Sequence, residues 1–197
     1  FVRGEGGDEA AALARAEASL KWRSDERVAE ILADPLDGAV VARVRAQLPS
    51  CWLGFNRRGE LVYMERTGAV RFAELMREIG PEALVRYHVL SLEFQNRVLL
   101  GRALRRSGEG ARPWCAWAAC ADGVGEGALP PRAPGSLRPV VTLIDMRGLG
   151  VGSVNRASLD VLRRIAAVDA LNYPENLRAL HVVHAPAIFA RAWRVIR

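Results

Sequence analysis

The sequence contains very little lysine, cysteine or histidine, and each shortage excludes a class of protein. Lys21 is the only lysine, so the net charge of +6 comes almost entirely from arginine. The arginines are scattered in runs no longer than a pair, which is not the pattern of a nucleic-acid-binding stripe. The three cysteines form no CxxC motif, so neither a disulfide framework nor a structural zinc site is expected, and a reducing, cytoplasmic compartment fits better.

Long apolar runs and common catalytic motifs are also lacking. No stretch reaches the roughly 18 apolar residues of a membrane-spanning helix, and no signal peptide is visible. There is no GxSxG elbow or GxxxxGK[ST] loop, and His181 and His184 are spaced to point to opposite faces of a predicted strand. We therefore expect no enzymatic activity, no metal site and no cofactor. The chain starts without methionine and ends in a helical pattern, so we expect a piece of a longer protein.

Apolar spacing and turn residues predict mostly helix in the first half of the chain. Apolar residues recur on one face over 8–22, where Asp8 suits the N-cap, and Pro81 suits the first turn of a longer helix. Turn residues over 56–59 separate two apolar runs, which predicts a hairpin. The predicted helices span 8–22, 25–33, 39–47, 71–78 and 81–106, and the predicted hairpin strands span 51–55 and 61–67.

The second half of the chain predicts alternating strands and helices. Before them, residues 107–138 are dominated by Gly, Pro, Ala, Arg and Ser, and we expect an exposed, disordered insertion there. Residues 139–146 are apolar on both faces, which predicts a central parallel strand covered on both sides. A helix over 154–170, a second buried strand over 178–184 and the start of a helix over 187–197 follow. This order predicts a βαβ unit in an α/β fold.

A glycine-rich segment follows the strand predicted over 139–146. Gly148, Gly150 and Gly152 suggest a dinucleotide-binding fingerprint, which needs GxGxxG tight against the strand end. Here the spacing is GxGxG, and Asp145, Met146 and Arg147 separate the strand from the first glycine. In addition, no strand ending in an acidic residue follows about twenty residues later. A loop softened by glycine is therefore the better interpretation.

Six segments resemble, in the right order, motifs of the CRAL-TRIO family, in particular its yeast phosphatidylinositol/phosphatidylcholine-transfer-like members. GELVYMERTGAV is similar to the family's DGRPVYFEELGAV, VTLIDMRGLGVGSV to TxxxDLKGxSxS, and NYPENL to NYYPERM. Each motif alone is weak, but the six occur in the right order and are spread over the whole chain except 107–138. The six segments are 1–23, 59–70, 87–97, 141–154, 172–177 and 184–197.

The resemblance implies an α/β fold in which a mixed sheet is the floor of a deep hydrophobic pocket, with a C-terminal helix as its lid. It implies an N-terminal helical segment over 1–48 and a lipid-binding domain over 49–197 that is incomplete at its C-terminus. Members of the family hold one phospholipid or other small hydrophobic molecule and exchange it at membranes. We accordingly expect a monomeric lipid carrier, peripheral at membranes, with a bound lipid as its ligand.

The resemblance also assigns candidate lipid-binding residues by matching position. Thr142 falls on a threonine that contacts the choline-lipid phosphate, and Glu175 falls on a glutamate of the inositol-lipid subsite. For the aromatic residues, simple packing in the core is the alternative interpretation. The full set of candidates, most of them apolar or aromatic, is Trp52, Tyr63, Phe94, Val140, Thr142, Tyr173, Glu175, Phe189 and Trp193.

Three departures from the family pattern bear on the ligand. Val140 stands where the prototype has a phosphate-binding serine, and Glu5 and Asn176 stand where it has arginines. The loss of two cations and a hydroxyl argues against tight binding of phosphoinositides. Phosphatidylcholine or a neutral hydrophobic molecule is the better prediction. The alternative function is a protein-interaction module on the same fold, with its pocket filled by side chains.

Overall fold

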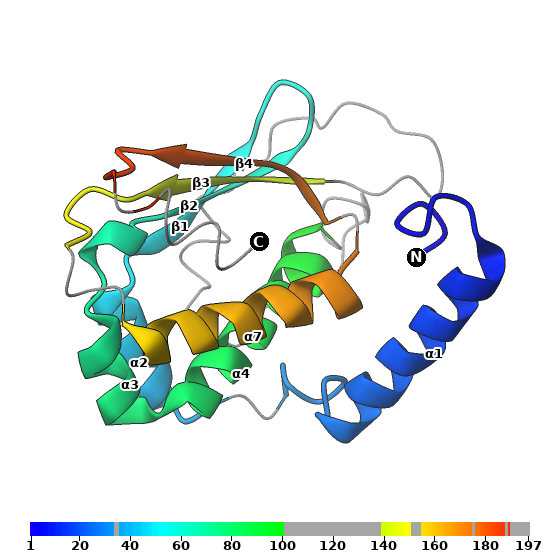
Figure 1. Ribbon diagram of the computed structural model, residues 1–197, viewed down its shortest axis with the longest axis horizontal. Helices are drawn as coiled ribbons and strands as arrows, with labels where there is room; N and C mark the ends of the chain where they lie inside the picture. Colours follow the sequence, from blue (N-terminus) through cyan, green and yellow to red (C-terminus); the bar gives the residue numbers. More distant parts are fainter. Residues whose placement is uncertain (34–35, 101–138, 151–154, 175, 188, 190–197) are drawn as a thin grey trace, which may run out of the picture.

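The computed structural model describes residues 1–33, 36–100, 139–150, 155–174, 176–187 and 189. Figure 1 shows helices and strands in two layers. The elements in chain order are α1 (Glu9–Asp25), α2 (Gly38–Gln47), β1 (Ser50–Phe55), β2 (Leu61–Glu65), the short 3-10 helix η1 (Thr67–Ala69), α3 (Phe72–Ile79), α4 (Pro81–Glu93), the π-helical segment η2 (Phe94–Leu99), β3 (Val140–Asp145), α7 (Arg156–Asn172) and β4 (Leu177–Val183).

The strands form one mixed sheet in the order β1-β2-β3-β4. β1 and β2 are antiparallel and form the predicted hairpin, whereas β2, β3 and β4 run parallel to one another. Helix α7 connects the parallel neighbours β3 and β4, so the predicted βαβ unit is confirmed. The α/β class predicted from the sequence is therefore correct.

Helix α1 begins as predicted, but the helix predicted over 25–33 is wrong. The Asp8 side chain accepts a hydrogen bond from the backbone of Ala11 and so caps the first turn. After α1 the chain makes turns, because Arg27 adopts a left-handed conformation with φ 51°. The turns bury Val28 and Ile31 completely in the core. Burial of these two apolar side chains favours the irregular path.

The long helix predicted over 81–106 is shorter and less regular than expected. Its α-helical part ends at Glu93, and the chain widens into the π-helical turns of η2. Phe94, at the start of η2, is 1% exposed, and Leu99 at its end is also buried. The segment 101–106 lies outside the described residues. The extra residue per turn in a π-helix shifts which side chains face the core, and apolar spacing alone does not reveal such a shift.

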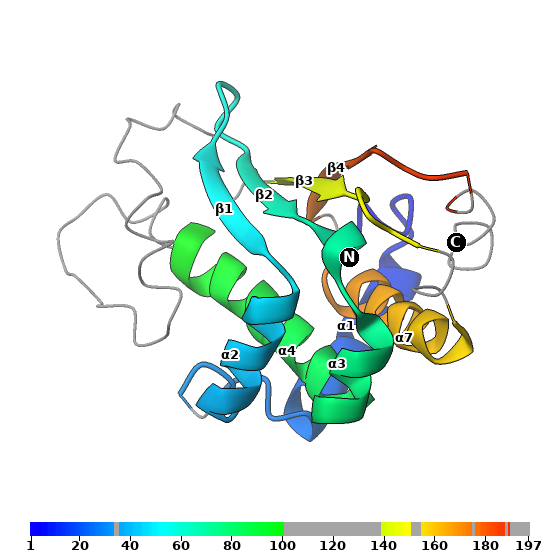
Figure 2. The same ribbon diagram turned by 90° about the vertical axis from the view of Figure 1, so that its left-hand side faces the viewer.

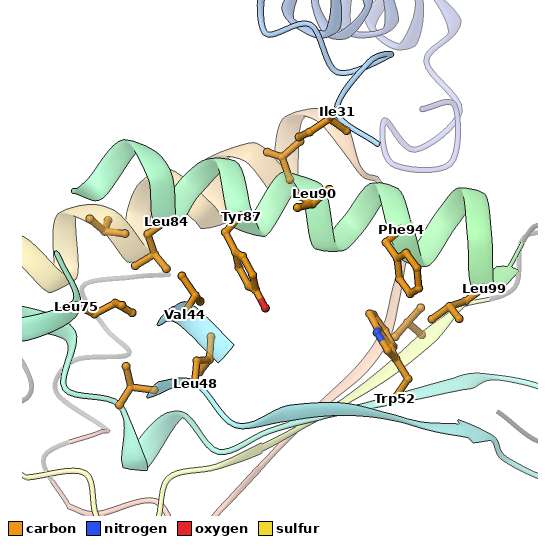
Figure 3. Packing of buried hydrophobic residues seen from close by; sticks show 14 of the residues in the cluster. Ile31, Val44, Leu48, Trp52, Leu75, Leu84, Tyr87, Leu90, Phe94 and Leu99 are labelled. Atoms are coloured by element: carbon orange, nitrogen blue, oxygen red, sulfur yellow. The ribbon is translucent and has the colours of Figure 1, made fainter. Parts of the chain in front are cut away.

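The described helices all lie on one side of the sheet, as both views show (Figures 1 and 2). Much of the core lies between these two layers, where Tyr87 of α4 points toward the sheet and Trp52 of β1 points toward the helices (Figure 3). Ile31 extends the core to the far side of α4. The prediction that β3 is covered on both faces is not met by the described residues, because only Val140 of this strand is fully buried. β4 was also predicted to be buried, but all its residues are partly or fully exposed. It is an edge strand of the described sheet, so one flank has no neighbouring strand.

Candidate functional site

The sheet register brings several of the predicted lipid-binding residues into one row. Trp52 of β1 pairs with Tyr63 of β2, and Tyr63 pairs with Thr142 of β3. Residues paired across neighbouring strands share a face of the sheet, and so do residues two apart on one strand. Val140 therefore shares the face of Thr142. This face points toward the helices, because Trp52 and Val140 pack in the same core cluster as Phe94.

Trp52, Phe94 and Val140 form the closely packed end of this row. They are only 9%, 1% and 3% exposed. Figure 3 shows the ring of Trp52 rising from β1 toward Phe94, which comes down from the helical layer. The Trp52 and Tyr63 rings lie 4.5 Å apart between centroids. Trp52, Phe94 and Val140 are thus part of the core. For the two aromatic residues, this agrees with the alternative interpretation of simple packing.

The polar end of the row is built around Glu65 at the end of β2. The Tyr63 hydroxyl donates to one Glu65 carboxylate oxygen at 3.1 Å, and the Thr67 hydroxyl donates to the other at 2.5 Å. Burial, and secondarily the negative charge of Glu65, raises the pKa of the Tyr63 phenol well above its ordinary value. Tyr63 therefore stays protonated at physiological pH. Sequence reasoning missed Glu65 as a member of this group.

Thr142 of β3 lies next to Tyr63 in the row, and its hydroxyl is unused. Its side chain is partly exposed and makes no hydrogen bond to any residue that the structure describes. Its neighbours on the same face are Tyr63 opposite it on β2 and three apolar residues, Val140 and Ile144 on β3 and Leu180 opposite it on β4. A hydroxyl can both donate and accept one or more hydrogen bonds. Thr142 can therefore bond to a phosphate or ester oxygen of a molecule that is otherwise held by apolar contacts.

Tyr173 lies away from this face of the sheet. Its hydroxyl donates to Glu93 at 2.7 Å, and its ring meets the Trp22 ring edge-on with 6.3 Å between centroids. Burial, and then the charge of Glu93, raises the pKa of Tyr173 above its ordinary range. Glu93 is itself 2% exposed and pairs with Arg23 at 2.9 Å and with Arg97 at 2.5 Å. The structure therefore gives Tyr173 a buried polar cluster as its surroundings, and not the row with Trp52.

The glycine-rich segment and His184 meet at the ends of β3 and β4. Asp145 accepts hydrogen bonds from the Arg147 backbone at 2.9 Å and from Nδ1 of His184 at 3.0 Å. The Arg147 bond is the main reason why the pKa of Asp145 lies below its usual range, and His184 adds to it. Gly148 has a φ of 91° and lies against Gly68. The described part of this segment is thus a tight turn beside η1, where glycine is needed for conformation and space.

Some predicted residues cannot be placed. Glu175, Trp193, Gly152 and the whole insertion predicted over 107–138 lie outside the described residues. Phe189 is described and partly exposed, and its backbone N–H donates to Pro186 at 2.8 Å. His181 is exposed on β4, apart from the Asp145–His184 pair. The roles of Glu175, Phe189 and Trp193 in lipid binding stay predictions.

Two hollows on the described part of the chain lie away from Thr142. One, of about 250 Å³, lies where α2 meets β1 and β2 and includes Leu48, Cys51 and Met64 in its lining. The other, of about 560 Å³, includes Arg57, Val141 and Arg178. Neither is the apolar cavity that the resemblance implies over Thr142, so that cavity stays a prediction. No described helix has the length and apolar content to span a membrane.

The sequence is similar to those of known lipid-transfer and CRAL-TRIO domain proteins. Phosphatidylinositol/phosphatidylcholine transfer protein SFH12 of Arabidopsis thaliana is 26% identical over 178 residues, 90% of this chain and 28% of that protein. CRAL-TRIO domain-containing protein T23G5.2 of Caenorhabditis elegans is 26% identical over 196 residues, which cover 100% of this chain and 23% of that protein. The chain thus spans about a quarter of the length of the curated relatives it matches.

The fold has a solved counterpart in the crystal structure of Sfh5. The two superimpose with a TM-score of 0.65 at 14% sequence identity, over 99% of this chain and 56% of the other. The mixed sheet and its helices are therefore shared at the level of the fold. In addition, the family model of the CRAL/TRIO domain matches residues 46–197, which is most of the chain. The chain belongs to the CRAL/TRIO domain family.

Proposed function

We propose that the chain is the ligand-binding part of a lipid carrier. It holds one phospholipid or other small hydrophobic molecule against the helix-facing side of the sheet and exchanges it at membranes. Several relatives carry the name phosphatidylinositol/phosphatidylcholine transfer protein, which supports the class of ligand. The observation that carries the proposal is the Thr142 hydroxyl, which is partly exposed beside the apolar side chains of Ile144 and Leu180 and has no partner in the described structure.

In this proposal, apolar side chains on the face of the sheet bind the acyl chain of the ligand, and Thr142 binds its polar head. Apolar side chains such as Ile144 and Leu180 are only partly buried and can cover an acyl chain. Each CH₂ group removed from water contributes about 0.8 kcal/mol, so this contact supplies most of the affinity. Thr142 then fixes the polar head by a hydrogen bond, which selects a ligand more than it strengthens binding. No chemical step is needed, and we propose none.

The charges near this face favour a zwitterionic or neutral ligand. The Glu65 side chain shares the face of Tyr63, because the two residues are two apart on β2, and its carboxylate lies within hydrogen-bond distance of the Tyr63 hydroxyl. A phosphoinositide head group would be repelled by this charge. Val140 offers no second hydroxyl beside Thr142, and Glu5 is engaged with Arg15 near α1. These observations support phosphatidylcholine or an uncharged hydrophobic molecule over a phosphoinositide.

A second candidate function is a protein-interaction module on the same fold. The close packing of Trp52, Phe94 and Val140 favours it, because these side chains fill the space beside Thr142 with protein atoms. Mass spectrometry of an organic extract of the purified protein separates the two functions. A lipid present at about one molecule per protein supports the carrier. An extract without lipid from a well-folded protein contradicts the carrier and favours the interaction module.

The Thr142→Val variant is expected to retain and transfer phosphatidylcholine about 10- to 150-fold less well than the natural protein. The change keeps the shape of the side chain but removes a hydrogen bond to a charged phosphate, which is worth about 1.5–3 kcal/mol. A vesicle-to-vesicle transfer assay with labelled phosphatidylcholine measures the effect. Thermal unfolding is expected to change little, because the Thr142 hydroxyl has no partner within the described structure.

Val183→Thr is the matched control for this prediction. Val183 of β4 pairs with Asp145, three residues after Thr142 on β3, so it points to the opposite face and the variant places a hydroxyl on the side away from the helices. Its transfer activity is expected to equal that of the natural protein. Equal transfer by Thr142→Val and the natural protein would contradict the role of Thr142, whatever the control does.

A further inference from the structure

The turn between β1 and β2 presents two adjacent arginines on a fixed support. Figures 1 and 2 show this hairpin projecting beyond the rest of the described sheet. The Asn56 side chain accepts hydrogen bonds from the backbone of Arg58 at 2.9 Å and of Glu60 at 3.0 Å, and Gly59 closes the turn with a φ of 70°. Arg57 and Arg58 are both exposed at this tip. Their backbone is therefore held in place while their side chains face solvent.

The same two arginines line a hollow on the side of the sheet that faces away from the helices. The hollow has a volume of about 560 Å³ and is open to solvent. Arg178 reaches it from the neighbouring part of β4, and Val141 and Ala179, which pair across β3 and β4, supply apolar surface. The complete lining is Asn56, Arg57, Arg58, Glu60, Val141, Arg178, Ala179 and His181. Three guanidinium groups, two from the hairpin and one from β4, therefore lie around the same hollow.

The hollow has an excess of positive charge. Among the described residues that line it, Glu60 alone carries a carboxylate. This carboxylate is 8% exposed, accepts a hydrogen bond from the Asn56 amide at 2.8 Å and lies 3.7 Å from Nε of Arg178. Glu60 therefore holds Asn56 and Arg178 in position and offsets one of the three positive charges. The side chains of Arg57 and Arg58 are exposed, and guanidinium groups bind phosphate oxygens in pairs.

We propose that this hollow is a docking site for an anionic membrane surface, where the phosphate groups of lipids bind Arg57, Arg58 and Arg178. The inference rests on the proposed function, because a lipid carrier has to meet the membrane with which it exchanges its ligand. A membrane suits the site better than a soluble ligand does, because the hollow is open and its arginines lie on a projecting tip. Because Arg57 and Arg58 lie on the opposite side of the sheet from Thr142, docking and ligand binding use different faces.

The Arg57→Ala/Arg58→Ala variant is expected to bind anionic vesicles about 25-fold less tightly than the natural protein. Each basic residue near an anionic surface contributes about fivefold to partitioning, so two contribute about 25-fold. Co-sedimentation with vesicles of phosphatidylcholine containing about 20% phosphatidylserine measures this effect at moderate ionic strength. Vesicles of pure phosphatidylcholine are expected to bind weakly and equally to both proteins. Raising the salt concentration is expected to remove the difference between the proteins.

Arg163→Ala/Arg164→Ala is the matched control, because it removes the same charge from the exposed surface of α7. An equal loss of binding in this control would overturn the site and indicate a general charge effect. Failure of the natural protein to bind anionic vesicles would also overturn it. So would saturable binding of inorganic phosphate, without vesicles, that is lost in the hairpin variant, because this would indicate a site for a free anion.

The lipid content of each purified variant separates this inference from the proposed function. If the hairpin variant still contains its lipid but no longer sediments with anionic vesicles, both proposals are supported. If the natural protein contains lipid but never binds anionic vesicles, only the docking site is wrong. If neither protein contains lipid, the carrier function is wrong, and the vesicle assay then judges the docking site by itself.

Discussion

Replacement of Glu93 by alanine is expected to lower the free energy of unfolding by about 3 kcal/mol, toward the lower end of the range for breaking a buried ion pair. The Glu93 carboxylate is 2% exposed and is bound by Arg23, Arg97 and the Tyr173 hydroxyl. The alanine variant removes this acceptor from all three partners, of which Arg97 keeps its hydrogen bonds to the backbone carbonyls of Val28 and Ala29. The arginines are partly exposed and regain some hydration, which is why we expect the lower end of the range.

Thermal unfolding measures this effect. For a chain of this size, 1 kcal/mol shifts the midpoint by about 2–4 °C, so Glu93→Ala is expected to lower it by about 6–12 °C. Glu82→Ala is the control, because Glu82 pairs with Arg164 on the surface, where solvent screens such pairs and they contribute little to stability. If the two variants had equal midpoints, Glu93 would not be a structural anchor of the helical layer.

Replacement of Gly68 by alanine is expected to destabilise the protein by about 2–3 kcal/mol, as is typical of overpacking at a site that cannot expand. Gly68 lies in η1, and a Cβ atom there would fall on the backbone carbonyl group of Met146 and on the carbonyl oxygen of Arg147. These are backbone atoms just after β3, where the backbone N–H of Met146 donates a hydrogen bond to the carbonyl oxygen of Val183 in β4. They cannot rotate away as a flexible side chain could, so the sheet itself would have to shift.

Gly38→Ala is the matched control for Gly68→Ala. Gly38 is the first residue of α2, and a Cβ atom there would meet nothing within 4 Å. Alanine at such a position restricts the unfolded chain and is expected to stabilise the protein by about 0.4–1 kcal/mol. Urea unfolding of both variants tests the pair. A Gly68→Ala protein as stable as the Gly38→Ala protein would show that the contact between η1 and the end of β3 is loose.

Local patterns in the sequence predicted the regular elements well. The hairpin and the βαβ unit follow from turn residues and from apolar runs, which depend on neighbours along the chain. The helix predicted over 25–33 failed for a different reason. Val28 and Ile31 gain more from burial in the shared core than they would from a regular helix, and this core exists only in the folded chain. The π-helical turns after Glu93 are also absent from any simple periodicity.

The candidate site was predicted only in part. The motif order put Trp52, Tyr63 and Thr142 in one group, and the structure brings them together because the strands that carry them are neighbours. Tyr173 lies apart from this group, because it contacts Glu93, 80 residues earlier in the chain. The roles of all four residues in lipid binding stay predictions. A glutamate at the end of an amphipathic helix carries no local sign of so distant a partner. Arg97, four residues after Glu93, is the one signal that could have suggested a buried pair.

The contributions of the first 48 residues to the interior have a practical consequence for anyone who designs a shorter protein for crystallisation. These residues supply Val28, Ile31, Val44 and Leu48 to the same core as the strands. They also supply Arg23, which neutralises Glu93. A truncated version that starts at residue 49 would expose apolar core surface and would leave the Glu93 carboxylate without Arg23 as a counterion. Such a version is expected to aggregate during purification, so expression trials should retain α1 and α2.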